Sequence, residues 1–312
     1  MDEVPPIIET HALTRDFKKT RAVDSLDLSI RPGELFGLVG PDGAGKTTTL
    51  RLLAGLLDIT SGSAKVAGYD LARQPEAIKR KIGYMAQQFS LYGELSVAEN
   101  LSFFADLYDV PPAELEERTE RLLAFAGLTE FKDRRAAYLS GGMQKKLALA
   151  CTLIHQPEIL LLDEPTTGVD PVSRREFWDI LTDLNLGGTT IIVSTPYMDE
   201  ADRCLRVGLM YEGHMVVCAE PRQIRAMVKG ELIELRPDDW QAAAALVATL
   251  PGVFEVQTYG ELLHVFVDSA DRRLPGIEAA LGEHGLACRS IRRATPRMEE
   301  AFISLVGHLE ED

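Results

Sequence analysis

The chain has 312 residues, 46% of them hydrophobic and 26% charged, which is typical of a soluble globular protein with one large and one small domain. Its 33 lysines and arginines stand against 48 aspartates and glutamates, and the net charge of −15 argues against a nucleic-acid groove as the main surface. The four cysteines are scattered without metal-ligand spacing, so neither a disulfide framework nor a cysteine-bound metal is expected.

The sequence predicts neither an export signal nor a membrane span. The opening stretch MDEVPPIIETHAL has acidic residues and prolines where a signal peptide has basic and then apolar residues. No apolar run approaches the roughly 20 residues that a spanning helix needs. We therefore expect another chain to supply the membrane part of any membrane process that this protein serves.

The first two thirds of the chain read as an α/β pattern. An antiparallel strand pair is predicted in residues 11–30, where polar and apolar residues alternate around a basic turn. A buried strand at 33–40 precedes a helix at 46–57, and residues 96–127 are strongly helical by their period. The runs EILLLDEP and TTIIVST lack alternation, which indicates central strands of a parallel sheet covered on both faces.

The pattern changes near Pro221. The order strand, helix, strand, helix, strand is predicted from ELIELRP, Asp239–Leu250, LLHVFVDS, Pro275–His284 and ACRSIRRATP. Such a β-α-β-α-β order indicates a small α+β module of roughly eighty residues without a chemical motif of its own. We therefore expect two domains, residues 1–225 and 226–312.

Residues 40–47, GPDGAGKT, fit the pattern G-x-x-x-x-G-K-[ST] between a predicted strand and a predicted helix. In such a loop the backbone N–H groups wrap a phosphate, Lys46 reaches the β and γ phosphates, and the Thr47 hydroxyl ligates Mg²⁺. A glycine-rich turn with a solvated lysine is the alternative, and the strand-loop-helix context favours phosphate binding. The predicted nucleotide-binding residues are Gly40, Pro41, Asp42, Gly43, Ala44, Gly45, Lys46, Thr47 and Thr48.

An acidic pair ends the predicted strand in EILLLDEP. Asp163 is placed to hold Mg²⁺, and Glu164 is placed to polarise an attacking water. Without the phosphate loop, a pair that caps the next turn would explain these residues better. With the loop, nucleotide hydrolysis is the sharper interpretation.

The stretch YLSGGMQKKLALA, residues 138–150, places a serine and two glycines at the start of a predicted helix. Free N–H groups, a hydroxyl and the positive end of the helix dipole together favour an anion. Taken alone, the stretch equally describes an ordinary glycine-rich helix start.

Together, these motifs resemble those of the ATP-binding-cassette (ABC) ATPases over roughly residues 7–225, and LSGGMQKK resembles the signature motif of that family. The resemblance implies an α/β P-loop ATPase fold: a RecA-like core, an antiparallel β subdomain and a helical subdomain at about 88–155, beside the small C-terminal α+β domain. It implies ATP and Mg²⁺ as cofactors. It also implies that Ser140, Gly141 and Gly142 close over the nucleotide of a second subunit.

Other residues take roles from the same resemblance. Phe17 lies where the family stacks an aromatic ring on adenine, although a buried strand phenylalanine explains it equally well. Gln87 matches the glutamine that reaches Mg²⁺ and senses the γ-phosphate. Residues Phe89–Glu94 resemble the surface that docks a permease, and Val169–Pro171 resembles a loop that crosses the dimer interface.

The subfamily most similar to this chain comprises ATP-binding subunits of ABC-2-type exporters, and the first ATPase half of fused tandem exporters is also similar. SLYGELSVAENL and TPRMEEAFISLVG carry this likeness. It implies transmembrane permease subunits and a second nucleotide-binding domain as partners, a heterodimer being favoured, and no nucleic acid. It implies a peripheral location on the cytoplasmic side of the inner cell membrane.

The chain departs from the family where a histidine follows the strand TTIIVST. Here the order is Ser194, Thr195, Pro196, Tyr197. Proline has neither a side-chain donor nor a backbone N–H, so it cannot hydrogen-bond a γ-phosphate. Either a neighbouring residue compensates, or the nucleotide site of this subunit is slow while its signature motif serves the site of a partner.

Two other classes of function compete with transport. A soluble ABC ATPase of DNA repair, chromosome organisation or translation is the first, but the interval from Lys46 to Ser140 is compact and holds no CxxC pair, and the chain has a single cassette. A GTPase switch is the second, but no N-K-x-D follows the acidic strand. The sequence therefore favours an energising subunit of a transporter, with an unreadable substrate.

Overall fold

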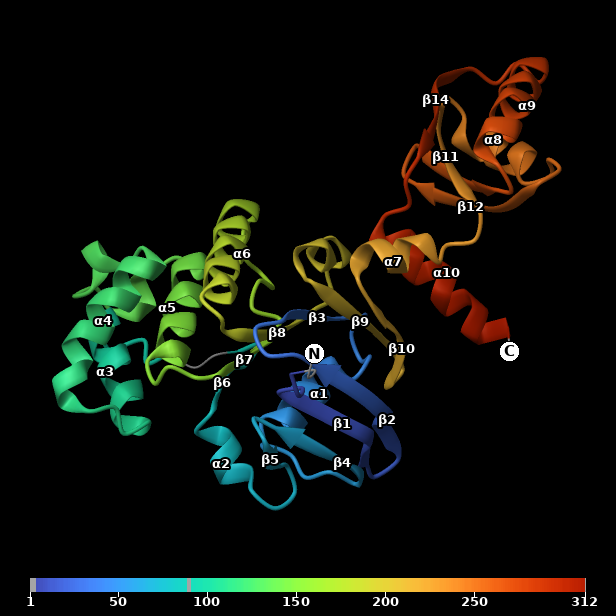
Figure 1. Ribbon diagram of the computed structural model, residues 1–312. Helices are drawn as coiled ribbons and strands as arrows, with labels where there is room; N and C mark the ends of the chain where they lie inside the picture. The colour runs from blue at the N-terminus through green and yellow to red at the C-terminus, as the bar shows by residue number, and fades with distance from the viewer. Residues whose placement is uncertain (1–3, 89–90, 312) are drawn as a thin grey trace. The chain divides into compact units, whose positions relative to one another are not determined.

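A computed structural model describes residues 4–88 and 91–311, which form two compact units, 1–220 and 221–312 (Figure 1). The predicted docking segment begins at Phe89, and Phe89 and Ser90 lie outside the described residues. Among the described helices, none combines the length and the apolar character needed to cross a bilayer.

A six-stranded sheet in the order β10-β9-β3-β8-β7-β6 forms the centre of the first unit. Neighbouring strands from β6 to β9 run parallel, and only β10 pairs antiparallel, with β9. The parallel strands β3, β7 and β8 are buried along their whole length, as their unbroken apolar runs predict. Their bounds are β3 Leu35–Val39, β6 Ile82–Met85, β7 Ile159–Asp163, β8 Thr190–Thr195, β9 Arg206–Tyr211 and β10 His214–Ala219.

A second, antiparallel sheet in the order β2-β1-β4-β5 lies beside the first. The hairpin of β1 and β2 confirms the predicted strand pair, and Phe17 pairs with Thr20 across its turn. One apolar core joins the hairpin, helix α1 and the inner faces of β3, β7 and β8. The elements are β1 Ile8–Phe17, β2 Thr20–Ile30, β4 Ser61–Val66, β5 Tyr69–Asp70 and α1 Lys46–Leu53.

Helices cover the remaining parts of the first unit. The predicted helical stretch 96–127 consists of two helices, because Asp109 turns with a φ of 55° just before two prolines. Ser96 and Glu99 cap the first of them with a reciprocal capping box. The helices are α2 Pro75–Lys79, α3 Val97–Leu107, α4 Pro112–Ala126, α5 Gly141–Leu153 and α6 Pro171–Leu186.

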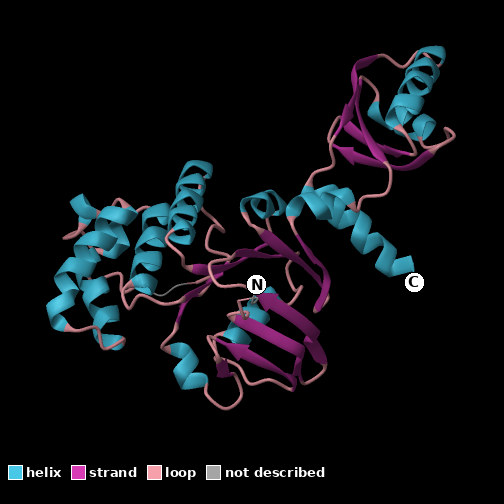
Figure 2. Cartoon of the chain, viewed as in Figure 1, coloured by secondary structure: helices cyan, strands magenta, loops and turns pink. Residues whose placement is uncertain are grey.

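The second unit contains a four-stranded antiparallel sheet in the order β12-β13-β11-β14. Helices α8 and α9 pack on one face of it through an apolar core (Figure 2). The chain order is β-α-β-β-α-β, a ferredoxin-like arrangement. Its elements are α7 Pro221–Ala226, β11 Glu231–Pro237, α8 Trp240–Val247, β12 Val253–Tyr259, β13 Leu262–Val267, α9 Ala270–Glu283, β14 Cys288–Ala294 and α10 Met298–Glu311.

The predicted order of this unit was wrong in two places. The strand β12 was missed because its sequence VFEVQTY lies at a sheet edge and buries none of its residues fully. Helix α9 begins at Ala270 rather than at Pro275, which stands inside the helix. Proline is common in a first helical turn, and the sequence pattern therefore suggested a start five residues too late.

A buried polar cluster attaches the first turn of α10 to the sheet of the second unit. The Nδ1 atom of His264 on β13 lies 2.8 Å from Glu300 on α10, and its Nε2 atom lies 3.7 Å from Glu234 on β11. The ring of Tyr259 lies 4.6 Å from the imidazole. Burial by itself raises the pKa of Glu300, but the contact with His264 and two backbone N–H groups outweigh it, so the net pKa is lowered.

Replacing His264 with alanine should destabilise the second unit by about 3 kcal/mol, because the buried Glu300 would lose the imidazole that it contacts, whereas Glu234 keeps its pair with Arg292. In the unmodified chain, the contribution of Glu300 should be complete above about pH 4.3 and decline as the pH falls toward its lowered pKa. Trp240 in a Trp178→Phe background reports unfolding of this unit by urea. The exposed pair of Arg289 and Asp238 is the control, and equal losses from His264→Ala and Arg289→Ala would contradict the prediction.

Candidate nucleotide site

The phosphate loop joins the carboxyl end of β3 to α1. The Nζ atom of Lys46 donates to the carbonyls of Gly40 and Pro41 at 2.8 and 2.9 Å. Gly45 precedes the helix with a φ of 101°, and a Cβ atom there would meet the carbonyl oxygen of Ala22 at 2.4 Å. Only glycine satisfies both conditions at this position.

Asp163 ends β7 beside the first turn of α1. Its Oδ1 atom accepts hydrogen bonds from the hydroxyls of Thr47, at 2.9 Å, and of Ser194, at 2.7 Å. The Tyr84 hydroxyl donates to its Oδ2 atom at 3.4 Å. A fully buried carboxylate next to the loop threonine supplies the oxygen ligands that Mg²⁺ prefers.

Glu164 stands next along the chain with a φ of 46°, an unusual backbone conformation for a residue with a side chain. Its backbone N–H donates to the Ser194 hydroxyl at 3.0 Å, and its carboxylate accepts from the amide of Gln87 at 2.8 Å. The ammonium of Lys46 lies 3.4 Å from the same carboxylate. Strain at a buried acidic residue, held by three contacts, is typical of a functional site.

One cavity of about 500 Å³ gathers most of the predicted site. Its walls include residues 42–48 of the phosphate loop, Phe17 and Ala22 of the β1–β2 hairpin, Gln87 and Glu164. Phe17 is 40% exposed, so the alternative interpretation of Phe17 as a buried strand residue is wrong. Carboxyl ends of neighbouring parallel strands converge here, at the usual ligand edge of such a sheet.

The serine-glycine-glycine stretch caps α5 in a different place. Ser140 is exposed, and its Oγ atom accepts from the N–H of Met143 at 3.3 Å. A Cβ atom on Gly141 would meet nothing within 4 Å, whereas one on Gly142 would meet Ser173 of α6 at 2.5 Å. Gly141 therefore leaves an open approach to the helix start, while Gly142 allows α5 to pack on α6.

The loop around Asp170 also starts a helix. Asp170 is exposed and caps α6 by accepting from the N–H groups of Val172 and Ser173. These bonds lower the pKa of its carboxyl. This contact supplies a structural reason for the aspartate within the chain itself.

Sequence reasoning missed three residues that connect the site. Ser194 bonds both acidic residues, and the Thr167 hydroxyl donates to Glu164 at 3.3 Å. Lys145 of α5 donates to the carbonyl of Gln87 at 2.9 Å, and burial lowers its pKa. Two features of the sequence pointed to them: Ser194 is a polar residue near the end of a predicted strand, and Lys145 follows the glycine pair.

A second buried carboxylate shapes the segment around Pro196. Glu200 accepts from the hydroxyls of Thr195, at 2.6 Å, and Thr166, at 2.8 Å, and its Oε1 atom pairs with Arg174 at 2.8 Å. The Thr195 hydroxyl also accepts from the N–H of Tyr197. The guanidinium of Arg174 lies 4.5 Å from the Tyr197 ring. The Thr195 hydroxyl is therefore fully engaged within the protein.

A phosphate loop, an Asp-Glu pair and a glutamine that meet at the carboxyl edge of a parallel sheet define a P-loop nucleotide-binding domain. The family model described as ABC transporter matches residues 23–167. The solved structure of cbiO1 from Clostridium perfringens has a TM-score of 0.66 and 28% identity, over 72% of this chain and 92% of that one. A dimeric structure of the ATP-binding cassette MJ0796 with ADP and Pi has a TM-score of 0.63 and 26% identity, over 68% of this chain and 98% of that one.

Curated relatives extend the likeness to the whole chain. The daunorubicin/doxorubicin resistance ATP-binding protein DrrA of Streptomyces peucetius is 34% identical over 310 residues, 98% of this chain and 94% of that protein. The probable multidrug ABC transporter ATP-binding protein YbhF of Escherichia coli is 42% identical over 288 residues, 92% of this chain. This chain spans about half the length of that relative, 49%. It belongs to the family of ABC transporter ATP-binding proteins, and the predicted α/β fold is confirmed.

Proposed function

We propose that the chain binds ATP with Mg²⁺ in the cavity of the phosphate loop. The contact between Thr47 and Asp163 at 2.9 Å carries this proposal, because it joins a hydroxyl and a carboxylate at the loop that receives the phosphates. Bound Mg²⁺ would neutralise phosphate charge, and Thr47, Asp163 and Gln87 are the residues that would hold it. Lys46 would balance the charge of the β and γ phosphates, and Phe17 would stack on the base.

Glu164 is the proposed catalytic base for ATP hydrolysis. It stands at the cavity wall, where its carboxylate can take a proton from a water molecule or polarise it. The amide of Gln87 donates to one carboxylate oxygen at 2.8 Å, and the ammonium of Lys46 lies 3.4 Å from the other. Gln87 is thus a positioning residue that couples the loop at residues 86–88 to the chemistry.

ATP hydrolysis by this chain would energise an exporter. Two relatives support this proposal, a probable multidrug ABC transporter ATP-binding protein and a daunorubicin/doxorubicin resistance ATP-binding protein. A permease would dock near residues 89–94, and a second nucleotide-binding domain, in a heterodimer, would meet Ser140, Gly141 and Gly142. The chain would then lie on the cytoplasmic side of the inner membrane, held there by the permease.

The nucleotide site of this chain is proposed to hydrolyse slowly. Pro196 supplies no donor, and the hydroxyl of the preceding residue, Thr195, is bonded to Glu200. The ring of Tyr197 packs against Arg174 of α6. These contacts argue against local compensation for the absent histidine.

The proposed Mg-ATP site is tested by Thr47→Val, which removes one hydroxyl at almost constant side-chain volume. In the presence of Mg²⁺, calorimetric ATP affinity should fall at least about tenfold, since a direct metal ligand is lost. In EDTA, the variant should bind ATP like the unmodified chain. Thr182→Val on α6 is the control, and an unchanged Mg²⁺ dependence in Thr47→Val would refute the site.

A further inference from the structure

The ring of Phe17 has a charged neighbour over one of its faces. The guanidinium of Arg15, two residues earlier on β1, lies 4.6 Å from the ring centroid. Phe17 and Ala22 are the residues of this hairpin that line the cavity, and Arg15 lies outside that wall among the described residues. One face of the ring is therefore covered by a cation while the ring still borders the cavity.

Arg15 is itself tied to the rest of the antiparallel sheet. Its Nη1 atom donates to the carbonyl of Asp58 at 2.6 Å, just before β4. The backbone N–H of Asp16 donates to the Thr60 hydroxyl at 3.0 Å in the same segment. These two bonds attach Arg15 and the residue after it to the segment before β4, so the guanidinium has a defined position beside the ring.

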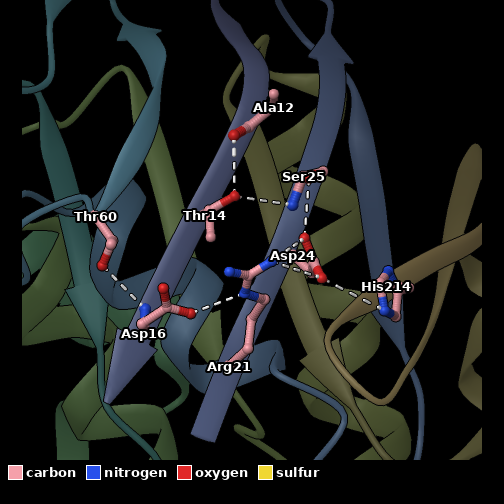
Figure 3. A network of polar contacts seen from close by, with 8 residues as sticks. All are labelled: Ala12, Thr14, Asp16, Arg21, Asp24, Ser25, Thr60 and His214. Atoms are coloured by element: carbon pink, nitrogen blue, oxygen red, sulfur yellow. Dashed lines mark hydrogen bonds and ion pairs between the residues drawn. The ribbon is translucent and has the colours of Figure 1, made fainter. Parts of the chain in front are cut away.

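The turn after Phe17 is closed by an ionic network (Figure 3). Arg21 on β2 donates to Asp16 at 2.9 Å and lies 3.3 Å from both carboxylate oxygens of Asp24. Asp24 in turn lies 3.8 Å from His214 and bonds through its backbone to the carbonyl of Gly213 at 2.9 Å. The end of the hairpin is thereby attached to the turn between β9 and β10.

The same turn also touches the phosphate loop. The N–H of Gly213 donates to the carbonyl of Ala44 at 3.1 Å, and the carbonyl of Ala22 abuts Gly45. Backbone contacts of this kind leave little freedom between hairpin and loop. The Phe17 ring thus stands at a set position relative to the place that receives the phosphates.

We propose that Arg15 is a positioning residue for recognition of the nucleotide base. The arginine backs the Phe17 ring so that the opposite ring face accepts the flat π face of a purine, and the ionic network keeps this platform in place before binding. A platform that is already ordered loses little conformational entropy when the base arrives. The inference rests on the proposed nucleotide site and adds to it the residue that orients the base platform.

The test compares two probes by calorimetry on the full chain: ATP, and inorganic tripolyphosphate, which has the three phosphates but lacks the adenosine. Arg15→Ala should weaken ATP binding about 3- to 10-fold and leave tripolyphosphate binding unchanged, since only the base uses the platform. Arg15→Lys, which keeps a cation but not the planar fork, should show the same selectivity to a smaller degree. Arg31→Ala, at the far end of β2, should change neither affinity.

Equal losses for both probes would mean that Arg15 supports the fold rather than the base, and unchanged ATP binding in both Arg15 variants would overturn the inference. If the proposed nucleotide site is wrong, the result is different, because ATP would then still bind to the Lys46→Ala variant. If Lys46→Ala abolishes binding of both probes while the Arg15 variants change neither affinity, only the proposed role of Arg15 is wrong.

Discussion

Lys46→Ala should lower the affinity of the chain for ATP by about 10²–10³-fold, because it removes a nearly buried cation from a site that receives several negative charges. The substitution also leaves the carboxylate of Glu164, 3.4 Å from Nζ, buried without a neighbouring cation. The ATP-binding cavity would then carry a net negative charge on its floor. Calorimetric titration with ATP and Mg²⁺ measures the loss directly.

The matched control for this prediction is Lys79→Ala. Lys79 is a partly exposed lysine on α2 that pairs with Glu76 at 2.6 Å, and its loss removes one charge from the same unit. ATP affinity should stay unchanged in that variant, because exposed pairs contribute little. Undiminished ATP binding by the Lys46→Ala variant would show that the phosphate loop is not part of the nucleotide site.

Ser140→Arg should stop ATP hydrolysis by the complete transporter complex, whereas Glu164→Gln should change it little. Ser140 caps α5 beside the open approach at Gly141, and the proposed partner site closes on these groups. A bulky side chain there would keep the two domains apart and remove donors that favour a developing phosphate charge, at a cost of about 10²–10³ in rate. Under the proposal of a slow site in this chain, Glu164 would contribute little to total turnover.

Steady-state ATPase activity of the reconstituted complex distinguishes these outcomes when each substitution is made separately. Exposed Tyr138→Ala, two residues before the serine, is a control that leaves the helix cap intact. Equal loss of activity from Glu164→Gln and Ser140→Arg would show that the site of this chain carries turnover. In that case the proposed inequality of the two sites is wrong.

The sequence predicts best those parts of the fold that follow from continuous local patterns. The buried strands β3, β7 and β8 and the phosphate loop follow from apolar runs and glycine spacing. Edge strands such as β12 have mixed composition, and their pairing depends on partners distant in the sequence. They therefore could not be found by periodicity alone.

The candidate site likewise contains residues that local sequence patterns predict and residues that they do not. The positions of Lys46 and Asp163 follow from motif and strand end, and the structure brings them to one edge of the sheet. Arg15 and Lys145 also make contacts with residues far away in the sequence, Asp58 and Gln87, which no spacing rule encodes. The two glycines of the signature stretch look alike in the sequence, yet only their surroundings give them different tasks.

The proposal that the nucleotide site of this chain is slow is tested most directly by the number of ATP molecules that a complex cleaves in its first turnover. In rapid-quench kinetics the amplitude of the fast phase counts competent sites, because chemistry is separated from product release. Pro196→His should raise this amplitude by about one ATP per copy of this chain, since a donor to the phosphate is restored. An amplitude that is already complete in the unmodified complex, or that Pro196→His leaves unchanged, would contradict the proposal.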